Sequence, residues 1–438
     1  MNKIEFLKLH CLAKMGDKEA LYKLSGCYLF GLGCDVDITK GYHLLKKSAK
    51  YGFEPAQISL DYMFDNNDEA IRFSNEFAEH YEAVKRLRQA AEDGDAFAQY
   101  FIAESRVKDD SVSQYVKQEG FKWLKKSAAQ NFGPALYLLG IKYLEGDSDI
   151  LQKNEKLGAE LLKKSADKGH LPAIMKVAAF YAEGTFFNQD FKEAIKYYKM
   201  AADKDNPQAL VILGKNLSSG RFTGQNLELA KKYFQKAIEL QYIPAYYELG
   251  LLYCRKEHRD AIEAFKNFSI AANAGFPPAE YELGVCYRWG EGVPADIQKA
   301  IYWMELSANK GYSMAKHNLG LYYENGIGVE SNIQKAVQYY TEAAEDEENY
   351  EAQFCLGRCY FNGNGVEQNY NEAIKWFMKA ASQDEPDSIF HLAICYGNGL
   401  GVEQDNEKSL RYLITAANLG WQPAIEILKE NGIEPTNK

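Results

Sequence analysis

Four residues with metal-binding side chains occur in two segments that lie 36 residues apart. Cys355 and Cys359 are separated by four positions, and His391 and Cys395 have the same separation. Residues four apart lie on one face of a helix, so two neighbouring helices could bring three thiolates and one imidazole together. This set of ligands is typical of a structural zinc site.

A second interpretation is that the same residues are packing positions. The position of Cys359 and Cys395 falls about 20° from the apolar stripe of its helix, at the helical step of 100° per residue. A cysteine without a metal packs as a small apolar residue. Helix axes lie about 8–10 Å apart, which does not guarantee that four side chains converge on one ion. We therefore expect no metal and no cofactor, and the zinc site stays as the alternative.

No other spacing is typical of catalysis. The motifs GxSxG, HExxH, paired CxxC and the phosphate-binding GxxxxGK[ST] are absent. The densest acidic run, residues 345–348, is predicted to be a solvated turn. The loops GEGVPAD, GIGVESN, GNGVEQN and GLGVEQD are predicted to end helices, because no strand precedes them and no Lys-Ser/Thr follows. We therefore expect that the protein is not an enzyme.

The elements that must position these residues recur along the whole chain. An alanine, replaced once by Ser388, marks each repeat at intervals of 34 to 42 residues. In the stretch 279–311, Ala279, Leu283, Tyr287 and Gly290 fall on one helix face, and a second apolar stripe follows a Gly/Pro loop. A fixed period of this length predicts a solenoid of helix pairs.

The repeat frame is A-x3-L-G-x2-Y-x2-G, followed by D-x3-A-x2-W-x3-[SA]-A-x2-G. It resembles the Sel-one-like repeat, a relative of the tetratricopeptide repeat. The resemblance implies an all-α solenoid, a right-handed superhelix of helix pairs that acts as an adaptor or scaffold. Some secreted bacterial members have a regular cysteine pair in each repeat and are linked to β-lactam recognition, and this sequence lacks that pairing.

The repeat pattern divides the chain into three parts. Residues 1–16 are predicted to be an N-terminal capping helix, and residues 17–420 eleven repeats, of which 53–133 are degenerate. Residues 421–438 are predicted to be a C-terminal half-repeat and tail.

The face of each first helix opposite its packing stripe is the candidate binding surface. Two positions after the repeat alanine, seven of eleven residues are aromatic, and this face lines the concave side of a helix-pair solenoid. Aromatic, arginine and asparagine side chains are typical of recognition surfaces. The alternative is that the aromatic rings pack on their neighbours. The predicted partner-binding residues are Tyr247, Tyr281, Arg288, Trp289, His317, Asn325, Phe354, Arg358, Asn362, Phe390 and Asn398.

Composition restricts the class of partner. The chain contains 51 basic and 61 acidic residues, a net charge of −10, which argues against general binding to nucleic acid or a membrane surface. The N-terminal segment lacks the continuous apolar core of a signal peptide. We expect a cytoplasmic monomer that binds a protein or peptide. The alternatives are an immunity or inhibitor protein that binds one toxin, and a β-lactam-binding or β-lactam-hydrolysing protein.

The irregular spacing of the eight cysteines predicts free thiols. Unfolding without reductant, followed by alkylation and intact-mass measurement, should show eight modified cysteines. A mass that shows two or more disulfides would contradict the cytoplasmic prediction. Zinc retained after washing with a chelator would support the Cys3His alternative.

Overall fold

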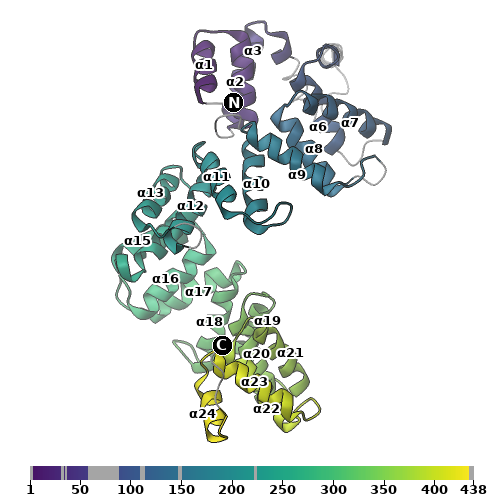
Figure 1. Ribbon diagram of the computed structural model, residues 1–438. Helices are drawn as coiled ribbons and strands as arrows, with labels where there is room; N and C mark the ends of the chain where they lie inside the picture. Colours follow the sequence, from purple (N-terminus) through teal and green to yellow (C-terminus); the bar gives the residue numbers. More distant parts are fainter. Residues whose placement is uncertain are drawn as a thin grey trace, which may run out of the picture. The chain divides into compact units, whose positions relative to one another are not determined.

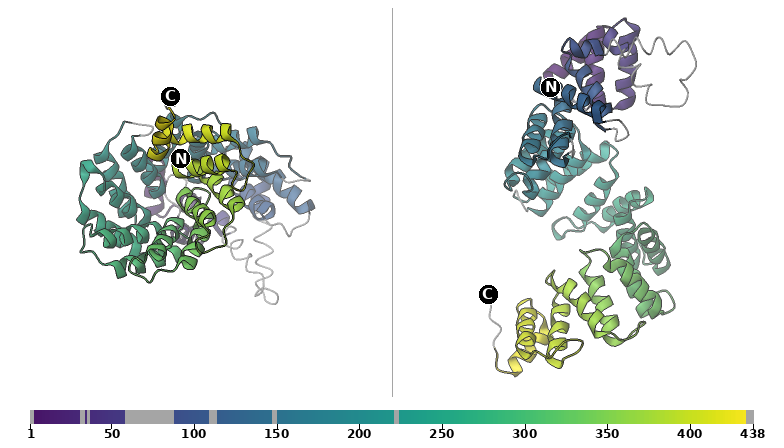
Figure 2. Two further views of the ribbon diagram at one scale, coloured as in Figure 1. Left: turned by 90° about the horizontal axis from the view of Figure 1, so that it is seen from below. Right: turned by 90° about the vertical axis from the view of Figure 1, so that its right-hand side faces the viewer.

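A computed structural model describes residues 3–30, 34, 37–57, 88–108, 114–146, 150–220 and 224–433. In these ranges the regular structure is helical and contains no strand (Figures 1 and 2). No helix in these ranges combines the length and the apolar character needed to cross a bilayer. The chain forms two compact units, Met1–Tyr242 and Ile243–Lys438, which we call unit 1 and unit 2.

Unit 1 consists of helix pairs, and helices that follow one another within residues 3–57 and within residues 88–242 pack on each other. Its helices are α1 (Lys3–Lys14), α2 (Lys18–Phe30), α3 (Ile38–Lys50), α6 (Ala96–Lys108), α7 (Gln114–Ala129), α8 (Gly133–Glu145), α9 (Glu155–Asp167), α10 (Leu171–Glu183), α11 (Phe191–Ala202), α12 (Pro207–Ser219) and α13 (Leu227–Glu239).

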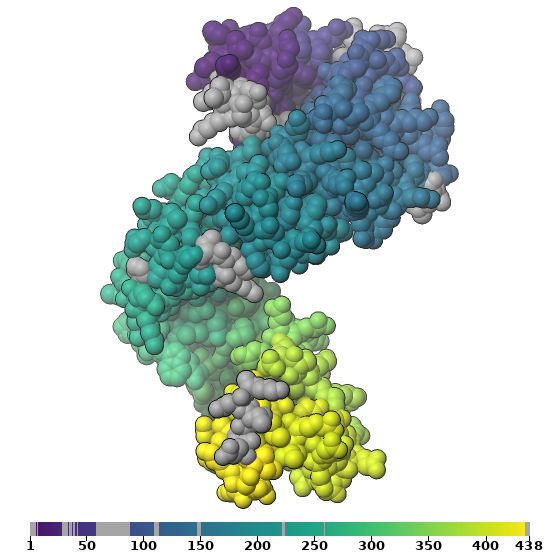
Figure 3. Space-filling model, in the orientation of Figure 1, coloured from purple at the N-terminus to yellow at the C-terminus, as the bar shows by residue number. Residues whose placement is uncertain are grey.

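Unit 2 repeats the same arrangement and ends in a single short helix. Its elements are α14 (Ile243–Tyr253), the 3-10 turn η1 (Lys256–His258), α15 (Ala261–Asn273), α16 (Pro277–Trp289), α17 (Ile297–Asn309), α18 (Ser313–Asn325), α19 (Ile333–Ala344), α20 (Tyr350–Asn362), α21 (Tyr370–Ala381), α22 (Pro386–Asn398), α23 (Asn406–Asn418) and α24 (Gln422–Glu430). Within each unit, side chains close the space between the helices (Figure 3).

The second helix of each pair in unit 2 begins at an aspartate or asparagine. The side-chain oxygen accepts a hydrogen bond from the backbone N–H three residues later, which satisfies a donor that the first helical turn leaves unpaired. This cap fixes the start of the helix in each of the five pairs. The capping residues are Asp260, Asp296, Asn332, Asn369 and Asp405.

Small residues on the first helix allow the two helices of a pair to approach closely. The repeat alanines Ala279, Ala315 and Ala352 are fully buried. At Gly320, an added Cβ would lie 2.4 Å from the Tyr340 ring. At Gly357, it would lie 2.7 Å from the Phe377 ring. In these two pairs the glycine of the frame is therefore required by packing against an aromatic ring of the second helix.

A buried serine ties the end of several second helices to the start of their first helices. Ser48 Oγ donates to the carbonyl of Lys18 at 2.6 Å, and Ser307 Oγ donates to that of Pro277 at 2.7 Å. Two further serines in unit 1 make the same bond to the first residue of α6 and of α8. This hydrogen bond gives a physical reason for the recurring string LKKSA in unit 1.

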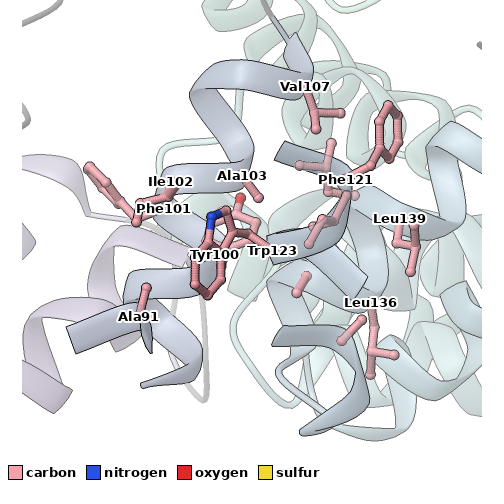
Figure 4. Packing of buried hydrophobic residues seen from close by; sticks show 14 of the residues in the cluster. Ala91, Tyr100, Phe101, Ile102, Ala103, Val107, Phe121, Trp123, Leu136 and Leu139 are labelled. Atoms are coloured by element: carbon pink, nitrogen blue, oxygen red, sulfur yellow. The ribbon is translucent and has the colours of Figure 1, made fainter. Parts of the chain in front are cut away.

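Apolar side chains from three successive helices form a core in unit 1 (Figure 4). Tyr100 and Phe101 of α6 belong to it together with Trp123 of α7 and Leu136 of α8, and all four are buried. The cluster thus runs from one helix pair into the next. Such nearest-neighbour packing is what makes a solenoid stable without a central core.

The glycine loops between paired helices have a structural role. Gly290, with φ of +73°, is the left-handed C-cap of α16, as the sequence predicts. Gly292 has the same φ, and a Cβ there would lie 2.1 Å from the carbonyl oxygen of Ala261 in the preceding repeat. The second glycine of the loop is therefore required by the close contact between repeats.

Gly292→Ala should destabilise unit 2 through both its backbone conformation and this clash. Gly311→Ala is a matched control, because Gly311 has φ of +91° but no atom within 4 Å of the added Cβ. Thermal or denaturant unfolding should show that Gly292→Ala costs about 1–3 kcal/mol more than Gly311→Ala. Equal losses of stability in the two variants would show that Gly292 makes no close contact with the preceding helix.

Candidate functional site

The predicted aromatic residues of unit 2 lie on five successive first helices, α14, α16, α18, α20 and α22. We call these five residues the aromatic column. Four of them are half-buried, and one, His317, is buried. Its members are Tyr247, Tyr281, His317, Phe354 and Phe390.

Three rings of the aromatic column pack against the following repeat. Tyr247 lies 5.5 Å from Phe276 between ring centroids, and Tyr281 lies 5.6 Å from Tyr312, both edge to face. Phe354 makes a similar contact with His391 of α22, at 5.5 Å between ring centroids. Edge-to-face pairs of this kind stabilise the contact between repeats. The partly exposed side of each ring is the part that a partner could touch.

Two side chains in the middle of the column form a buried pair. His317 Nε2 lies 3.7 Å from Cys355 Sγ. Burial, followed by the charge of Arg358, lowers the pKa of His317 to about 4, so its ring is neutral at physiological pH. Burial raises the pKa of Cys355 to about 12, so its sulfur is protonated. Neither group is set up as a nucleophile or general base at neutral pH.

The proposed zinc ligands do not come together as a metal site. Within the described ranges, no three His, Cys, Asp or Glu side chains are placed to hold an ion. His391 contacts the ring of Phe377 at 5.0 Å, and its Nδ1 lies 2.7 Å from the carbonyl oxygen of Asp387. Its ring therefore packs among apolar groups instead of converging with the three thiols.

Arg358 already has an internal carboxylate partner. Its Nη2 lies 2.7 and 2.8 Å from the two carboxylate oxygens of Glu324, and the Tyr340 hydroxyl donates to the same carboxylate at 2.5 Å. The arginine and glutamate side chains are 33% and 19% exposed. This ion pair joins α18 to α20, so a carboxylate of a partner would have to displace Glu324.

Arg288 and Trp289 at the end of α16 are more accessible. The guanidinium of Arg288 lies 4.6 Å from the Tyr322 ring centre and 4.9 Å from that of Trp289. The Trp289 side chain is 66% exposed. No carboxylate in the described ranges pairs with Arg288, so its hydrogen-bond donors remain available beside a large exposed ring.

Three asparagines lie at the C-terminal ends of α18, α20 and α22, and all three are exposed. Asn325 donates from Nδ2 to the Leu321 carbonyl at 2.9 Å, and Asn398 donates to that of Ile394 at 3.1 Å. These bonds hold the two amides while leaving each Oδ1 accessible as an acceptor. Asn362 occupies the equivalent place on α20.

A partly buried carboxylate next to the aromatic column was not identified from the sequence. Glu282 of α16 is half-buried, and no cation in the described ranges pairs with it. Burial, followed by the charge of Glu291, raises the pKa of Glu282 to about 7. After burial, the charge of Glu282 also contributes to the raised pKa values of Tyr247, Tyr281 and Tyr312.

The sequence signal for this carboxylate was present but weak. Glu282 directly follows a column residue and occupies the repeat position of Glu248 in α14. Many glutamates in the chain are solvated or paired, however, and the sequence does not show which carboxylates lack a cation. The raised pKa depends on burial between neighbouring helices, which only the structure provides.

Unit 1 contains an apolar cavity of about 430 Å³. Tyr22, Cys27, Phe97 and Phe132 contribute to its lining. Tyr22 holds the same repeat position as the residues of the aromatic column, and it packs on Phe97 at 5.2 Å. In unit 1, a residue at the repeat position of the aromatic column therefore lines a hollow.

Family comparison identifies the repeat. The family described as Sel1 repeat matches residues 18–52, 96–132, 133–170, 171–206, 207–242, 243–276, 277–312, 313–347, 351–385 and 386–421. No match falls within 53–95, and residues 58–87 of this segment lie outside the described ranges. The predicted division into eleven repeats therefore stays a prediction there.

Sequence and structure comparisons give relatives in yeast and bacteria. The chain is 26% identical over 318 residues to the chitin synthase regulator SKT5 of Saccharomyces cerevisiae. That match covers 69% of this chain but only 40% of the yeast protein.

Two solved structures share the fold. A protective antigen present in uropathogenic Escherichia coli strains, c5321, has a TM-score of 0.62 at 24% identity, over 97% of this chain and 90% of that one. A Sel1 repeat protein from Oxalobacter formigenes has a TM-score of 0.51 at 26% identity, over 80% and 91%. Both support a solenoid of Sel1 helix pairs.

The raised pKa of Glu282 predicts a pH-dependent effect on stability. The pKa of Glu282 in the folded protein lies above the ordinary value of 4.5. Between pH 4.5 and about pH 7, the folded protein therefore binds more protons than the unfolded chain. The ionised carboxylate then destabilises the fold increasingly as pH rises from 4.5 to about 7. After allowance for solvent screening, Glu282→Gln should raise the free energy of unfolding by about 1–2 kcal/mol at pH 8.

At pH 5, the gain in the free energy of unfolding from Glu282→Gln should be less than half as large, because most Glu282 carboxylates are then protonated. Glu407→Gln is the control, since the Glu407 side chain is 82% exposed. Melting curves at pH 5 and pH 8 measure both variants. Equal stabilisation by Glu282→Gln at the two pH values would show that the carboxylate is not raised in pKa.

Proposed function

The chain belongs to the Sel1 repeat family, and we propose that it is a non-enzymatic scaffold that binds a protein or peptide. The binding surface is the first-helix face of unit 2, which carries the aromatic column together with Arg288, Trp289 and the three asparagines. The observation that carries this proposal is the exposure of Trp289, whose ring is stacked by an arginine that pairs with no carboxylate in the described part of the chain.

The chemistry of this face supports binding to a polypeptide. Large, partly exposed rings provide apolar contact area, while arginine and asparagine supply hydrogen bonds to a peptide backbone or carboxylate. The column extends over five first helices, with neighbouring helix axes about 8–10 Å apart. A surface of this length matches an extended peptide or a helix better than a small metabolite.

The absence of a poised nucleophile in the central pair supports a non-catalytic role. Cys355 is protonated and His317 is neutral because both are buried. The yeast relative is a regulator of chitin synthase. A regulatory role supports the proposal that this chain also acts through binding, with its partner provided by the native host.

The test compares capture of host proteins by the wild-type chain and by variants of the proposed face. The double change Tyr281→Ala with Phe354→Ala should reduce binding to the captured partner by about 2 kcal/mol or more if these rings are hot spots. Trp289→Ala should also weaken binding, and it should leave the fold intact because the tryptophan is exposed.

Tyr302→Ala is the matched control. Tyr302 lies on a second helix, α17, and is 55% exposed, so its removal should leave binding unchanged. Circular dichroism and melting curves check the fold of each variant. Partner affinity that stays within a factor of two for both Trp289→Ala and the double variant would contradict the proposed surface.

A further inference from the structure

The apolar cavity of unit 1 is a second candidate site. Its volume of about 430 Å³ lies in the range of pockets that hold small molecules, roughly 300–1,000 Å³. Its lining comes from α1, α2, the starts of α6 and α8, and the end of α9. Residues from three helix pairs therefore contribute to one hollow, and all of them belong to unit 1.

Three aromatic rings form part of the cavity wall. Tyr22 of α2 lies 5.2 Å from Phe97 of α6 between ring centroids, and Phe97 lies 6.2 Å from Phe132 at the start of α8, both edge to face. These contacts fix the positions of the rings. Leu9 and Cys27 also line the cavity, and burial raises the pKa of Cys27 to about 12, so its sulfur is uncharged at neutral pH. This wall offers an apolar group a place out of water.

Two lysines carry the positive charge of the lining. Lys23 of α2 and Lys168, which follows α9, are both exposed. Lys23 bonds to Glu19 at 2.5 Å, but both side chains are 57% exposed, and an exposed ion pair of this kind contributes little stability. The ammonium group of Lys23 has several N–H donors, so the carboxylate of a ligand can share it with Glu19.

The negative charge of the lining is already used by the fold. Asp95 is the acidic residue among the described residues of the lining, and its Oδ1 accepts a hydrogen bond from the Ala98 N–H at 2.6 Å. This bond caps the first turn of α6. At the start of α8, by contrast, Phe132 makes no side-chain cap, so the positive end of that helix dipole also favours an anion beside the two lysines.

We propose that this cavity binds a fatty acid of medium chain length, with its apolar chain against the three rings and its carboxylate beside Lys23 and Lys168. The chain would leave water for a wall of aromatic and aliphatic carbon. Charge-assisted hydrogen bonds from the ammonium groups would orient the carboxylate. This inference goes beyond the proposed scaffold function, because no residue of unit 2 takes part in the site.

Other classes of ligand fit the cavity less well. A cationic amphiphile would meet two ammonium groups, and the carboxylate of Asp95 already caps α6. A sugar or a nucleotide needs hydrogen-bond partners for several polar groups, and the described lining has one side-chain amide, that of Asn131. A peptide must also satisfy its backbone N–H and C=O groups. A fatty acid needs only an apolar wall and a cation near its carboxylate.

The probe for this proposal is decanoate, measured by isothermal titration calorimetry below its critical micelle concentration. The wild-type chain should bind a single decanoate. Decyltrimethylammonium has the same apolar chain and the opposite charge, and it should bind at least about tenfold more weakly, because it cannot pair with the lysines. Equal affinity for the two amphiphiles would overturn the proposed class of ligand.

Gly26 of α2 provides a way to fill the cavity. It belongs to the lining, and a Cβ added there would lie 3.9 Å from Phe97 Cε2, an ordinary van der Waals distance. Gly26→Leu should therefore place its side chain in the hollow and weaken decanoate binding at least about tenfold. Gly26→Ala should weaken it about two- to fourfold. Leucine and alanine form helices better than glycine, so neither variant should melt below the wild-type chain.

Gly224→Leu is the matched control. Gly224 lies in the loop between α12 and α13, outside the cavity lining, and no atom lies within 4 Å of an added Cβ there. This variant should bind decanoate as the wild-type chain does. Lys23→Gln should weaken decanoate binding about three- to fivefold and strengthen binding of decyltrimethylammonium. A general loss of structure would weaken both amphiphiles, so the opposite changes identify an effect of charge.

The outcomes separate this cavity from the scaffold surface. If Gly26→Leu and Gly224→Leu bind decanoate equally, the amphiphile does not occupy the cavity and the proposal is overturned. If decanoate does not bind, while Gly26→Leu loses the protein partner captured from the host, the cavity holds an apolar side chain of that partner, and the fatty-acid proposal is again overturned. Neither result changes what Trp289→Ala tests in unit 2.

Discussion

The close approach of the two helices in each pair is the constraint on which the rest of the structure depends. In four pairs, an aromatic ring of the second helix fills the place that a side chain at the repeat glycine would occupy, as Tyr340 does at Gly320. The repeat alanine is fully buried on the same helix. Interiors are packed so closely that even one added methyl group at such a contact would displace a helix.

This constraint also explains why the chain is modular. Once the two helices of a pair are packed together, the next pair needs only to cover the apolar surface that remains exposed. The contact between successive repeats is close, because Gly292 lies directly against the carbonyl of Ala261. Ion pairs also form across the contacts between repeats, as Arg358 and Glu324 do.

Groups left without an internal partner stand out against this background. Arg288 stacks on Trp289 but pairs with no carboxylate in the described ranges, and Glu282 is half-buried with no cation partner in those ranges. An uncompensated, partly buried carboxylate reduces stability at neutral pH.

The sequence by itself determined the periodic features of the protein. The spacing of alanine, glycine and tyrosine predicts the helix pairs, and the Asp/Asn residues and glycine loops predict their starts and ends, because these depend on local backbone chemistry. It also indicated which residues share a helix face. Those inferences need only the helical period, which is the same in every repeat.

Only the tertiary structure decided which residues of the candidate face are buried or paired with other side chains of the protein. The sequence offered Arg358 and His317 as surface groups, yet one pairs with Glu324 and the other is buried beside Cys355. It gave no sign that Glu282 has no cation partner among the described residues. Side-chain partners across repeats depend on how neighbouring helices pack and on rotamers, and the helical period fixes neither of them.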